Sequence, residues 1–454
     1  MVPKVLFISV NRNSFPYPVY PLGLCHLAST VGRMGYQTNI CDMQTDDIDL
    51  PGVINSVDPD FIGLSLRNID NVDAAEPAYY VPDLVDAVKK VREASTAPVI
   101  LGGSGYSLFP GEMLEMTGAD FGICGEGEIA LPHLLENLVA QRPYDSIPGL
   151  VHKHNARIVI NPKDGCPVDA ISPVQRPRGL ATYYIERSSM LNIQTQRGCA
   201  YSCCYCTYPV IEGRTFRRRD PEVVCDEIAE AVHLGARYVF IVDSVFNTSE
   251  EHVAGICEEI LRRELKVQWG CFLRPKGISR SLMALMARAG LTHVEFGTDS
   301  LCDSVLEAYG KQFTVADVIH ASECARQAKV KYAHFLIIGG PAETGDTIRQ
   351  ALANSKRIKK SVFFPCIGMR VYPDTPLYTV ALQEGVVSPN ADLVEPYFYI
   401  SPHLSREEVV GLLQQHSVYM PNWIVGKLDP SLQKIMHNLI RVGVVGPRWE
   451  FLVR

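Results

Sequence analysis

The chain contains no hydrophobic run long enough to cross a membrane as a helix. Such a helix needs about 20 consecutive apolar residues, and no segment of the 454 residues approaches that length. The chain also lacks an excess of basic residues, because 43 Lys and Arg stand against 50 Asp and Glu, giving a net charge of −7. This balance argues against binding along a phosphate backbone. We therefore expect no membrane insertion and no nucleic-acid partner.

We also expect that the amino-terminal segment is not a secretion signal. The first apolar segment, residues 5–10, is short, follows a single lysine and runs into polar residues, which predicts a first β-strand. Fourteen cysteines without such a signal indicate a reducing compartment, where thiols bind metals or pack as small apolar groups. We expect a cytoplasmic protein without a disulfide framework.

Residues 1–146 alternate short apolar runs with amphipathic segments. This alternation predicts an α/β domain with a Rossmann-like, doubly wound parallel sheet. Ligands of such sheets bind at the carboxyl ends of the strands, where two glycine-rich turns allow close approach to the backbone. The expected strands are 5–10, 61–66, 99–101 and 121–124, the helices are 21–34, 81–94 and 129–138, and the turns begin at Gly102 and Gly125.

The rest of the chain divides into three further parts. Residues 147–190 contain a hairpin at 149–162 and a proline-rich linker, and residues 386–454 form a small helical cap with helices at 405–419 and 430–442. Between them, residues 191–385 repeat strand and helix six times, which predicts a partial (β/α)6 barrel with its site at the strand carboxyl ends. Its expected strands are 191–195, 238–242, 267–272, 293–297, 332–337 and 362–369, and its expected helices are 221–234, 250–264, 279–289, 315–328 and 344–358.

Three cysteines follow the first barrel strand at C-x3-C-x2-C spacing: Cys199, Cys203 and Cys206. Three thiolates can bind three irons of a [4Fe–4S] cube and leave the fourth iron free for a substrate or cofactor. A structural zinc site would need four protein ligands. The alternative is a group of buried free thiols. We expect Cys204, inside the same segment, not to be a ligand.

This segment resembles the motif of the radical S-adenosylmethionine enzymes, and the resemblance extends over roughly residues 185–385. It implies that S-adenosylmethionine binds the free iron, beside the aromatic Tyr205. In relatives, an acidic residue after the second strand lies near the cofactor's amino end, a Gly-x-Glu-Ser turn binds its ribose, and a glycine turn borders its adenine. The Gly-Gly-Glu signature that relatives have after the second strand is absent here, and Asp299 replaces the glutamate of the ribose turn. The residues that match these positions are Asp243, Asp299, Ser300, Gly339 and Gly340. The glycine turn alone is equally typical of a plain strand-to-helix connection.

Two arginines follow strands at the expected barrel mouth. Arg274 follows the third strand, and Arg370 follows the sixth. Either guanidinium could bind a carboxylate through two parallel hydrogen bonds, and Arg274 is a candidate cofactor ligand on this ground. A solvated or structural role is equally compatible with the sequence.

The amino-terminal domain resembles the cobalamin-binding domain that precedes the radical domain in one subgroup of this family. The resemblance implies that two turns line the nucleotide tail of the corrin. The Asp-x-His-x-x-Gly motif that supplies a cobalt ligand in many cobalamin proteins is absent. Arg67, followed by Asn68, is then placed to face the lower side of cobalt, where a cation has no lone pair to donate; a phosphate or carboxylate partner is the alternative for Arg67. The turn residues are Gly102, Gly103, Ser104, Gly125, Glu126 and Gly127.

The resemblance implies a cobalamin-dependent radical S-adenosylmethionine methyltransferase. Such an enzyme moves a methyl group from S-adenosylmethionine, via methylcobalamin, to a carbon of a small molecule, and it needs an external electron donor such as flavodoxin or ferredoxin. The alternative keeps both cofactors but catalyses a ring contraction or cyclisation without methylation. A third hypothesis is a non-catalytic cobalamin or redox sensor, which would not need the residues that resemble a ribose site.

Overall fold

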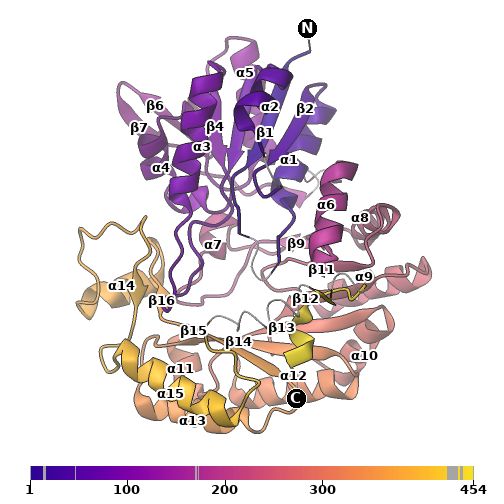
Figure 1. Cartoon of the computed structure of the whole chain (residues 1–454), viewed down its shortest axis with the longest axis vertical. Helices are drawn as coiled ribbons and strands as arrows, with labels where there is room; N and C mark the ends of the chain where they lie inside the picture. Colours follow the sequence, from indigo (N-terminus) through magenta and orange to yellow (C-terminus); the bar gives the residue numbers. More distant parts are fainter. Residues whose placement is uncertain are drawn as a thin grey trace. The chain divides into compact units, whose positions relative to one another are not determined.

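Two compact units make up the chain in a computed structural model (Figure 1). The first comprises Met1–Asn71, Tyr79–Tyr183 and Tyr208–Gly213, and the second comprises Val72–Ala78, Tyr184–Thr207 and Arg214–Arg454. The structure describes residues 2–13, 17–45, 48–168, 171, 173–426, 438–439 and 443–452. Within these ranges, no helix has the length and hydrophobicity needed to span a membrane.

A seven-stranded sheet forms the centre of the first unit, in the order β2-β1-β3-β4-β5-β6-β7. The first five strands in the chain pair in parallel, and β6 and β7 add an antiparallel hairpin at one edge. The expected hairpin is therefore confirmed, and it belongs to this sheet. The strands are β1 (Lys4–Ser9), β2 (Gln37–Asp42), β3 (Phe61–Ser65), β4 (Val99–Gly102), β5 (Phe121–Ile123), β6 (Leu150–His154) and β7 (Arg157–Ile160).

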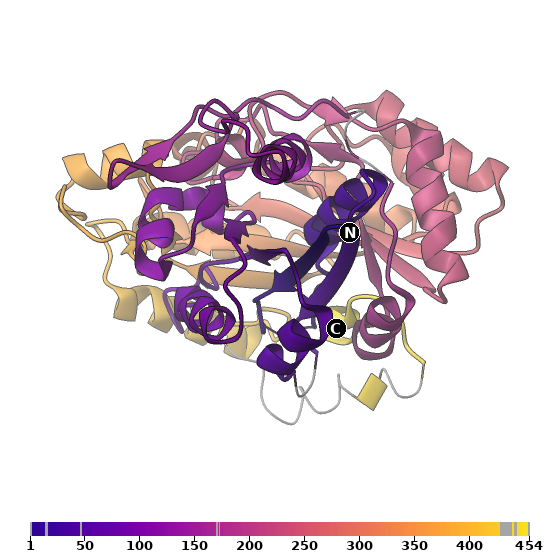
Figure 2. The same ribbon diagram turned by 90° about the horizontal axis from the view of Figure 1, so that it is seen from above.

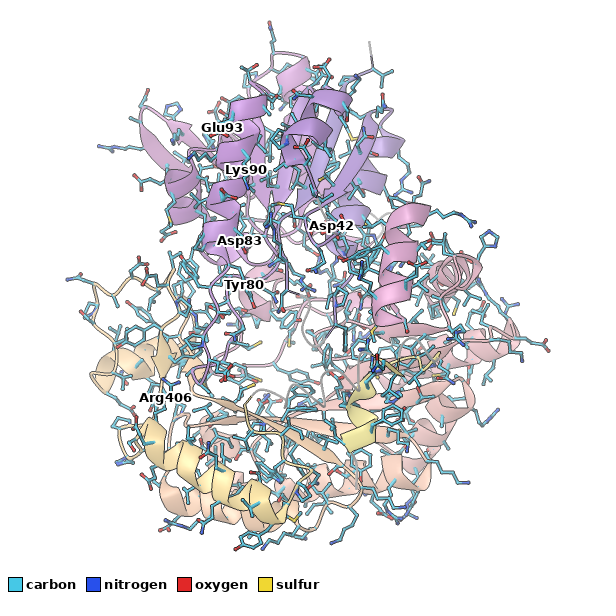
Figure 3. All side chains as sticks on the ribbon, viewed as in Figure 1. Asp42, Tyr80, Asp83, Lys90, Glu93 and Arg406 are labelled. Atoms are coloured by element: carbon cyan, nitrogen blue, oxygen red, sulfur yellow. The ribbon has the colours of Figure 1, made fainter. Side chains whose placement is uncertain are left out.

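Helices pack against this sheet in two groups (Figure 1). One group is α1 (Leu22–Arg33) with α5 (Gly127–Val139), and the other is α2 (Leu50–Val57), α3 (Val81–Ala94) and α4 (Pro110–Thr117). Apolar side chains of β1, α1 and α5 share one buried core. On α3, Asp83, Lys90 and Glu93 are polar positions outside its buried stripe (Figure 3). The strand order reverses between β1 and β3, which marks the crevice where sheets of this kind bind ligands.

Part of the expected linker is helical. The helix α6 (Arg178–Ser188) begins directly after Pro177, and Ala181, Tyr184 and Ser188 are buried at helical spacing. The prolines before α6 made its helical spacing hard to recognise in the sequence, because proline is compatible with a helix only near its start. A second short helix, α7 (Tyr208–Ile211), and a 3-10 turn, η1 (Tyr106–Leu108), complete the irregular segments.

Six parallel strands form the sheet of the second unit, in the order β15-β14-β13-β12-β11-β8. All six strands and the five helices expected between them are present, which confirms the partial barrel. Helices α8, α9 and α10 pack side by side (Figure 2). The strands are β8 (Leu191–Ile193), β11 (Tyr238–Ile241), β12 (Gln268–Leu273), β13 (Leu291–Asp299), β14 (Lys331–Ile338) and β15 (Val362–Ile367), and the helices are α8 (Pro221–His233), α9 (Glu250–Arg262), α10 (Arg280–Arg288), α12 (Val315–Gln327) and α13 (Gly345–Ser355).

Side-chain caps fix where the barrel helices begin. Each of the five helices follows a residue whose side-chain oxygen accepts a hydrogen bond from a backbone N–H of the first turn, which satisfies a donor that the helix cannot pair itself. These caps are Asp220, Ser249, Ser279, Thr314 and Thr344. Because the helices start at defined residues, the preceding loops that carry the site have defined lengths.

The carboxy-terminal segment packs on the second unit. As expected, α15 (Arg406–Tyr419) is helical; it contacts α13 and β15, and Arg406 donates a hydrogen bond to the carbonyl of Ala75 (Figure 3). The helix expected at 430–442 lies outside the described residues, apart from 438 and 439. In η3 (Arg448–Leu452), Trp449 packs on His293 near the start of β13, away from the strand end that carries the site.

Candidate functional site

A buried carboxylate anchors the loop that carries the cysteines. Asp243, two residues after the end of β11, accepts hydrogen bonds from the backbone N–H groups of Thr195 (2.7 Å) and Gln196 (3.2 Å) and from the Thr195 hydroxyl. Gln196 belongs to β9 (Gln196–Arg197), which pairs with β10 (Arg217–Arg218). Asp243 is fully buried, and these bonds hold the chain at the point where it enters the cysteine loop.

The four neighbouring cysteines of this loop differ in how far they are exposed to solvent. Cys199 is buried, whereas Cys203 and Cys206 are partly exposed, and the Cys206 N–H donates to the Cys203 carbonyl at 3.2 Å. The thiol of Cys204 lies 3.9 Å from the sulfur of Met369, in β16 (Met369–Arg370). Burial raises the pKa of Cys199, and it raises the pKa of Cys204 to about 12. The contact with Met369 distinguishes Cys204 from the other three cysteines, and its exclusion from the cluster ligands stays a prediction.

The three expected ligands do not surround a single ion. Among the described residues, the only group of three His, Cys, Asp or Glu side chains with all ligand atoms within 4.8 Å of one another lies elsewhere, at Asp145, His152 and His154. In a [4Fe–4S] cube each thiolate binds a different iron, which requires wider spacing than one metal ion does. Three thiols in one loop are the donor set that such a cluster takes.

Beside these cysteines, three polar side chains form a buried network. Asp299, at the end of β13, accepts a 2.5 Å hydrogen bond from the Tyr205 hydroxyl and forms an ion pair with Lys311. Lys311 also donates to the Tyr205 hydroxyl at 3.2 Å. Burial alone would lower the pKa of Lys311, but Asp299 and the thiols of Cys203 and Cys206 raise it overall. Lys311 therefore remains a cation.

The end of β13 also presents open backbone. Asp299 has a left-handed φ of 60°, and two residues earlier Gly297 is exposed with no atom within 4 Å of where a Cβ would stand. A flat ligand could lie against this backbone without meeting a side chain. Ser300 turns inward, where its hydroxyl accepts from the Cys302 N–H ahead of α11 (Asp303–Ala308).

At the end of β14, the glycine turn is built around a buried glutamate. Glu343 accepts hydrogen bonds from the N–H groups of Gly339 and Gly340 and, at 3.0 Å, from the Tyr309 hydroxyl. Burial raises the pKa of Glu343 to about 7. Gly339 has a φ of 103°, and a Cβ on Gly340 would lie 2.4 Å from the Tyr309 oxygen. Both glycines are required by the turn itself.

The two arginines at the strand ends have different surroundings. The Arg274 guanidinium stacks 4.1 Å from the ring centre of Tyr201, inside the cysteine loop, and no carboxylate in the part of the chain that the structure describes pairs with it. Arg370 is buried, and its guanidinium donates to the carbonyls of Val371 and Leu393. Arg370 therefore has a structural role, whereas Arg274 keeps its donors available.

In the first unit, the expected ligand loops meet at the strand-order reversal. Asn11, two residues after the end of β1, accepts a hydrogen bond from the backbone N–H of Arg67 (2.6 Å) and donates one to the carbonyl of Asn68 (3.2 Å). The Ser104 hydroxyl, after β4, donates to the Arg67 carbonyl at 2.8 Å. These bonds fix the backbone of the Arg67 segment between two other loops at the carboxyl edge of the sheet.

The two glycine turns of this unit differ in what they pack against. A Cβ on Gly103 (φ 102°) would lie 2.4 Å from the carbonyl oxygen of Leu66, and a Cβ on Gly127 would lie 3.0 Å from Leu27. Gly125 (φ 89°) donates to the Ser107 hydroxyl, and Glu126 accepts from the Cys166 N–H. By contrast, a Cβ on Gly102 would meet only the Ile123 carbonyl, at 3.9 Å. The backbone at Gly102 is therefore less crowded than that at Gly103, Gly125 or Gly127.

Comparison with known families agrees with this arrangement. Residues 8–135 match the B12 binding domain, and residues 193–353 match the radical SAM superfamily. The chain is a cobalamin-dependent radical S-adenosylmethionine enzyme. Its cofactors are a [4Fe–4S] cluster, S-adenosylmethionine and cobalamin, as the sequence predicted.

This radical S-adenosylmethionine enzyme is similar to several known proteins. Tryptophan 2-C-methyltransferase of Streptomyces laurentii is 23% identical over 82% of this chain and 74% of its own length. Anaerobic magnesium-protoporphyrin IX monomethyl ester cyclase of Rubrivivax gelatinosus is 25% identical over 76% of this chain and 64% of its own length. A radical S-adenosylmethionine methyltransferase from Kitasatospora setae, solved with cobalamin and a [4Fe–4S] cluster, has the same fold, with a TM-score of 0.89 and 23% identity over 100% of this chain and 97% of that one.

Several residues that lie beside the predicted site residues of this enzyme were not predicted from the sequence. Lys311, Tyr309 and Glu343 complete the two networks at the ends of β13 and β14, and Asn11 holds the Arg67 segment. The tripeptide Tyr309-Gly310-Lys311 follows a six-residue helix and has no hydrophobic periodicity. Helix α11 returns the chain to the end of β13 and so brings these residues beside the cysteine loop, where the Cys204 N–H donates to the Tyr309 carbonyl at 3.0 Å.

Proposed function

We propose that this enzyme methylates a carbon of a small molecule, with S-adenosylmethionine as methyl source and cobalamin as carrier. The observation that carries the proposal is the pair of cofactor domains, each with polar residues gathered at the carboxyl ends of its strands. Methyl transfer to a carbon is named for the relative from Streptomyces laurentii, which aligns over 82% of this chain.

When bound, cobalamin supplies a methyl-carrying cobalt, and the cluster supplies an iron that binds S-adenosylmethionine and an electron that can cleave it. Cys199, Cys203 and Cys206 hold the cluster in this proposal. Each thiolate adds a negative charge, and the ammonium of Lys311 offsets part of it in a site screened from water. The Lys311–Asp299–Tyr205 network holds the Asp299 carboxylate in position through an ion pair and a hydrogen bond.

We propose that Asp299 binds the ribose hydroxyls of S-adenosylmethionine. Its carboxylate can accept both hydroxyl protons, and the open backbone at Gly297 gives the ligand room beside it. Arg274 binds a carboxylate of either S-adenosylmethionine or the substrate, because its guanidinium is held by Tyr201 and pairs with no carboxylate of the described residues. Asp243 positions the cysteine loop, since its oxygens are already engaged by Thr195 and Gln196.

In the first unit, we assign Arg67 to the lower side of cobalt, and Asn68, Gly102, Gly103, Ser104, Gly125, Glu126 and Gly127 to loops around the corrin and its tail. The support is the position of these loops at the carboxyl edge of the sheet and the anchoring of the Arg67 backbone by Asn11 and Ser104. A guanidinium has no lone pair for cobalt, so cobalamin would lack a protein ligand there.

We propose an external electron donor, such as flavodoxin or ferredoxin, because one-electron cleavage of S-adenosylmethionine at the cluster requires a reductant. The second candidate reaction is ring closure without methylation, which the cyclase relative from Rubrivivax gelatinosus favours. The two candidates differ in what becomes of the methyl group of S-adenosylmethionine.

The test is an incubation of reconstituted enzyme with methyl-labelled S-adenosylmethionine, cobalamin, reductant and panels of small aromatic and heterocyclic acceptors. Methyl transfer predicts S-adenosylhomocysteine together with a labelled product. Formation of 5′-deoxyadenosine with an unlabelled, rearranged product would instead establish the cyclisation reaction.

A further inference from the structure

Outside the cofactor sites, two histidines and an aspartate meet at the edge of the first unit's sheet. The ligand atoms of Asp145, His152 and His154 all lie within 4.8 Å of one another. The Oδ1 atom of Asp145 is 3.4 Å from Nε2 of His152 and 3.7 Å from Nδ1 of His154. None of the three residues belongs to the glycine turns or the Arg67 segment.

The local fold prepares this arrangement. His152 and His154 are two residues apart on β6, so both side chains point to the same face of the sheet. Asp145 precedes β6, and its carbonyl accepts a 2.7 Å hydrogen bond from the Asn161 side chain, which also donates to the Ile147 carbonyl at 2.8 Å. The ring of Tyr144 packs edge-on against His152, with 5.9 Å between ring centres. The three ligands are thus held by the hairpin and by the segment before it.

The distances suit a shared metal ion better than direct hydrogen bonds. An N–H···O bond is usually about 2.9 Å long, and both observed separations exceed this. Ligand atoms around a tetrahedral ion with bonds of about 2.1 Å stand roughly 3.4 Å apart. Two imidazoles and one carboxylate are a donor set that zinc, cobalt and nickel accept.

Burial of the three residues also suits such a site. His152 is 4% exposed at its side chain, whereas His154 and Asp145 are 61% and 58% exposed. The buried imidazole of His152 is fixed in position by its surroundings. The exposed side chains of His154 and Asp145 allow an ion to enter from solvent and to keep water as its remaining ligands. One carboxylate leaves a bound divalent ion with a net positive charge, which the exposed position tolerates.

We propose that Asp145, His152 and His154 bind one divalent transition-metal ion of the zinc class, separate from the cluster. The ion takes three protein ligands and completes its coordination with water. It ties β6 to the segment that follows α5, and so stabilises the edge of the cobalamin-binding sheet.

The test uses the whole enzyme with its cluster reconstituted, so that the cluster cysteines are occupied. Co²⁺ is the probe, because its visible absorption reports its ligand set, and binding is counted by equilibrium dialysis. The variants are His154→Gln and Asp145→Asn, both at exposed positions, and the control is His133→Gln, at an exposed histidine of α5 in the same unit. His152→Ala is avoided, because it would open a cavity.

The expected result is about one Co²⁺ fewer per chain in both variants than in wild type and control, with loss of the corresponding absorption bands. Zn²⁺ should raise the thermal midpoint of the wild type and of the control more than that of either variant. Equal Co²⁺ binding by all four proteins, or loss in the control as well, would overturn the proposal and leave a simple His–Asp ion pair.

Discussion

Glu295 is a buried acidic residue of β13 that accepts a hydrogen bond from the carboxy-terminal segment of the second unit. Its carboxyl group is buried in β13, where the indole N–H of Trp449 donates to it at 2.9 Å. Burial raises the pKa of Glu295 from 4.5 to about 7, although the Trp449 hydrogen bond opposes this rise. The folded protein therefore holds the Glu295 proton more tightly than the unfolded chain does, and stability falls as the pH rises from about 4.5 to 7.

The Glu295→Gln substitution removes this ionisation and keeps an oxygen that can accept the Trp449 hydrogen bond. A rise in pKa from 4.5 to about 7 corresponds to about 3 kcal/mol of stability lost at high pH. We therefore expect Glu295→Gln to be more stable than wild type by up to about 3 kcal/mol at pH 8, and by less than about 1 kcal/mol at pH 5.

Urea unfolding followed by tryptophan fluorescence measures this difference. The chain has three tryptophans, and Trp269, Trp423 and Trp449 are all buried in the second unit, so the signal reports on that unit. Glu450→Gln is the control, because the neighbouring His293 lowers the pKa of Glu450, and its loss should reduce stability at pH 8. Equal stability of Glu295→Gln and wild type at pH 8 would refute the reasoning.

Three further predictions concern the cofactor residues. Cys203→Ala should lose the reconstituted cluster, whereas Cys204→Ala should retain about four irons per chain; equal loss in both variants would contradict the ligand assignment. Lys311→Met should shift the cluster to a more negative reduction potential in a titration followed by electron paramagnetic resonance, because a nearby buried cation is lost; Lys311→Arg is the control, and an unchanged potential in the Met variant would disprove the role. In electron paramagnetic resonance, cob(II)alamin bound to the enzyme should show no nitrogen splitting from an axial ligand. Arg67→Ala should slow methylation of cobalt while sparing cleavage of S-adenosylmethionine at the cluster. Nitrogen splitting, or equal loss of both reactions, would argue against the Arg67 assignment.

The barrel could be read from the sequence because each strand is a short buried run followed by a capped helix. The strand expected at 332–337 is observed as Lys331–Ile338, and the helix expected at 221–234 as Pro221–His233. The missed elements are those with weak patterns. The strand β2 is only partly buried over Gln37–Ile40, and the helices α2 and α4 have eight residues each. Their positions depend on pairing with β1 and packing against α3.

The candidate site was predictable where chemistry follows from spacing. The three cysteines stand in one short motif, so their donor set is evident without a structure. The roles of Asp243 and Glu343 were not, because each depends on hydrogen bonds to backbone groups that only the folded turns bring close. Lys311 lies 12 residues after Asp299 in the sequence, and its pairing with that carboxylate arises because α11 returns the chain to the end of β13.

The central claim, that cobalamin carries the methyl group, is tested most directly without any substrate. Reconstituted enzyme is mixed with methyl-labelled S-adenosylmethionine, cobalamin and reductant, and the cobalamin is recovered and analysed by mass spectrometry. We expect labelled methyl on cobalt together with an equal amount of S-adenosylhomocysteine. Recovery of unlabelled cobalamin from enzyme whose cluster still cleaves S-adenosylmethionine would contradict it.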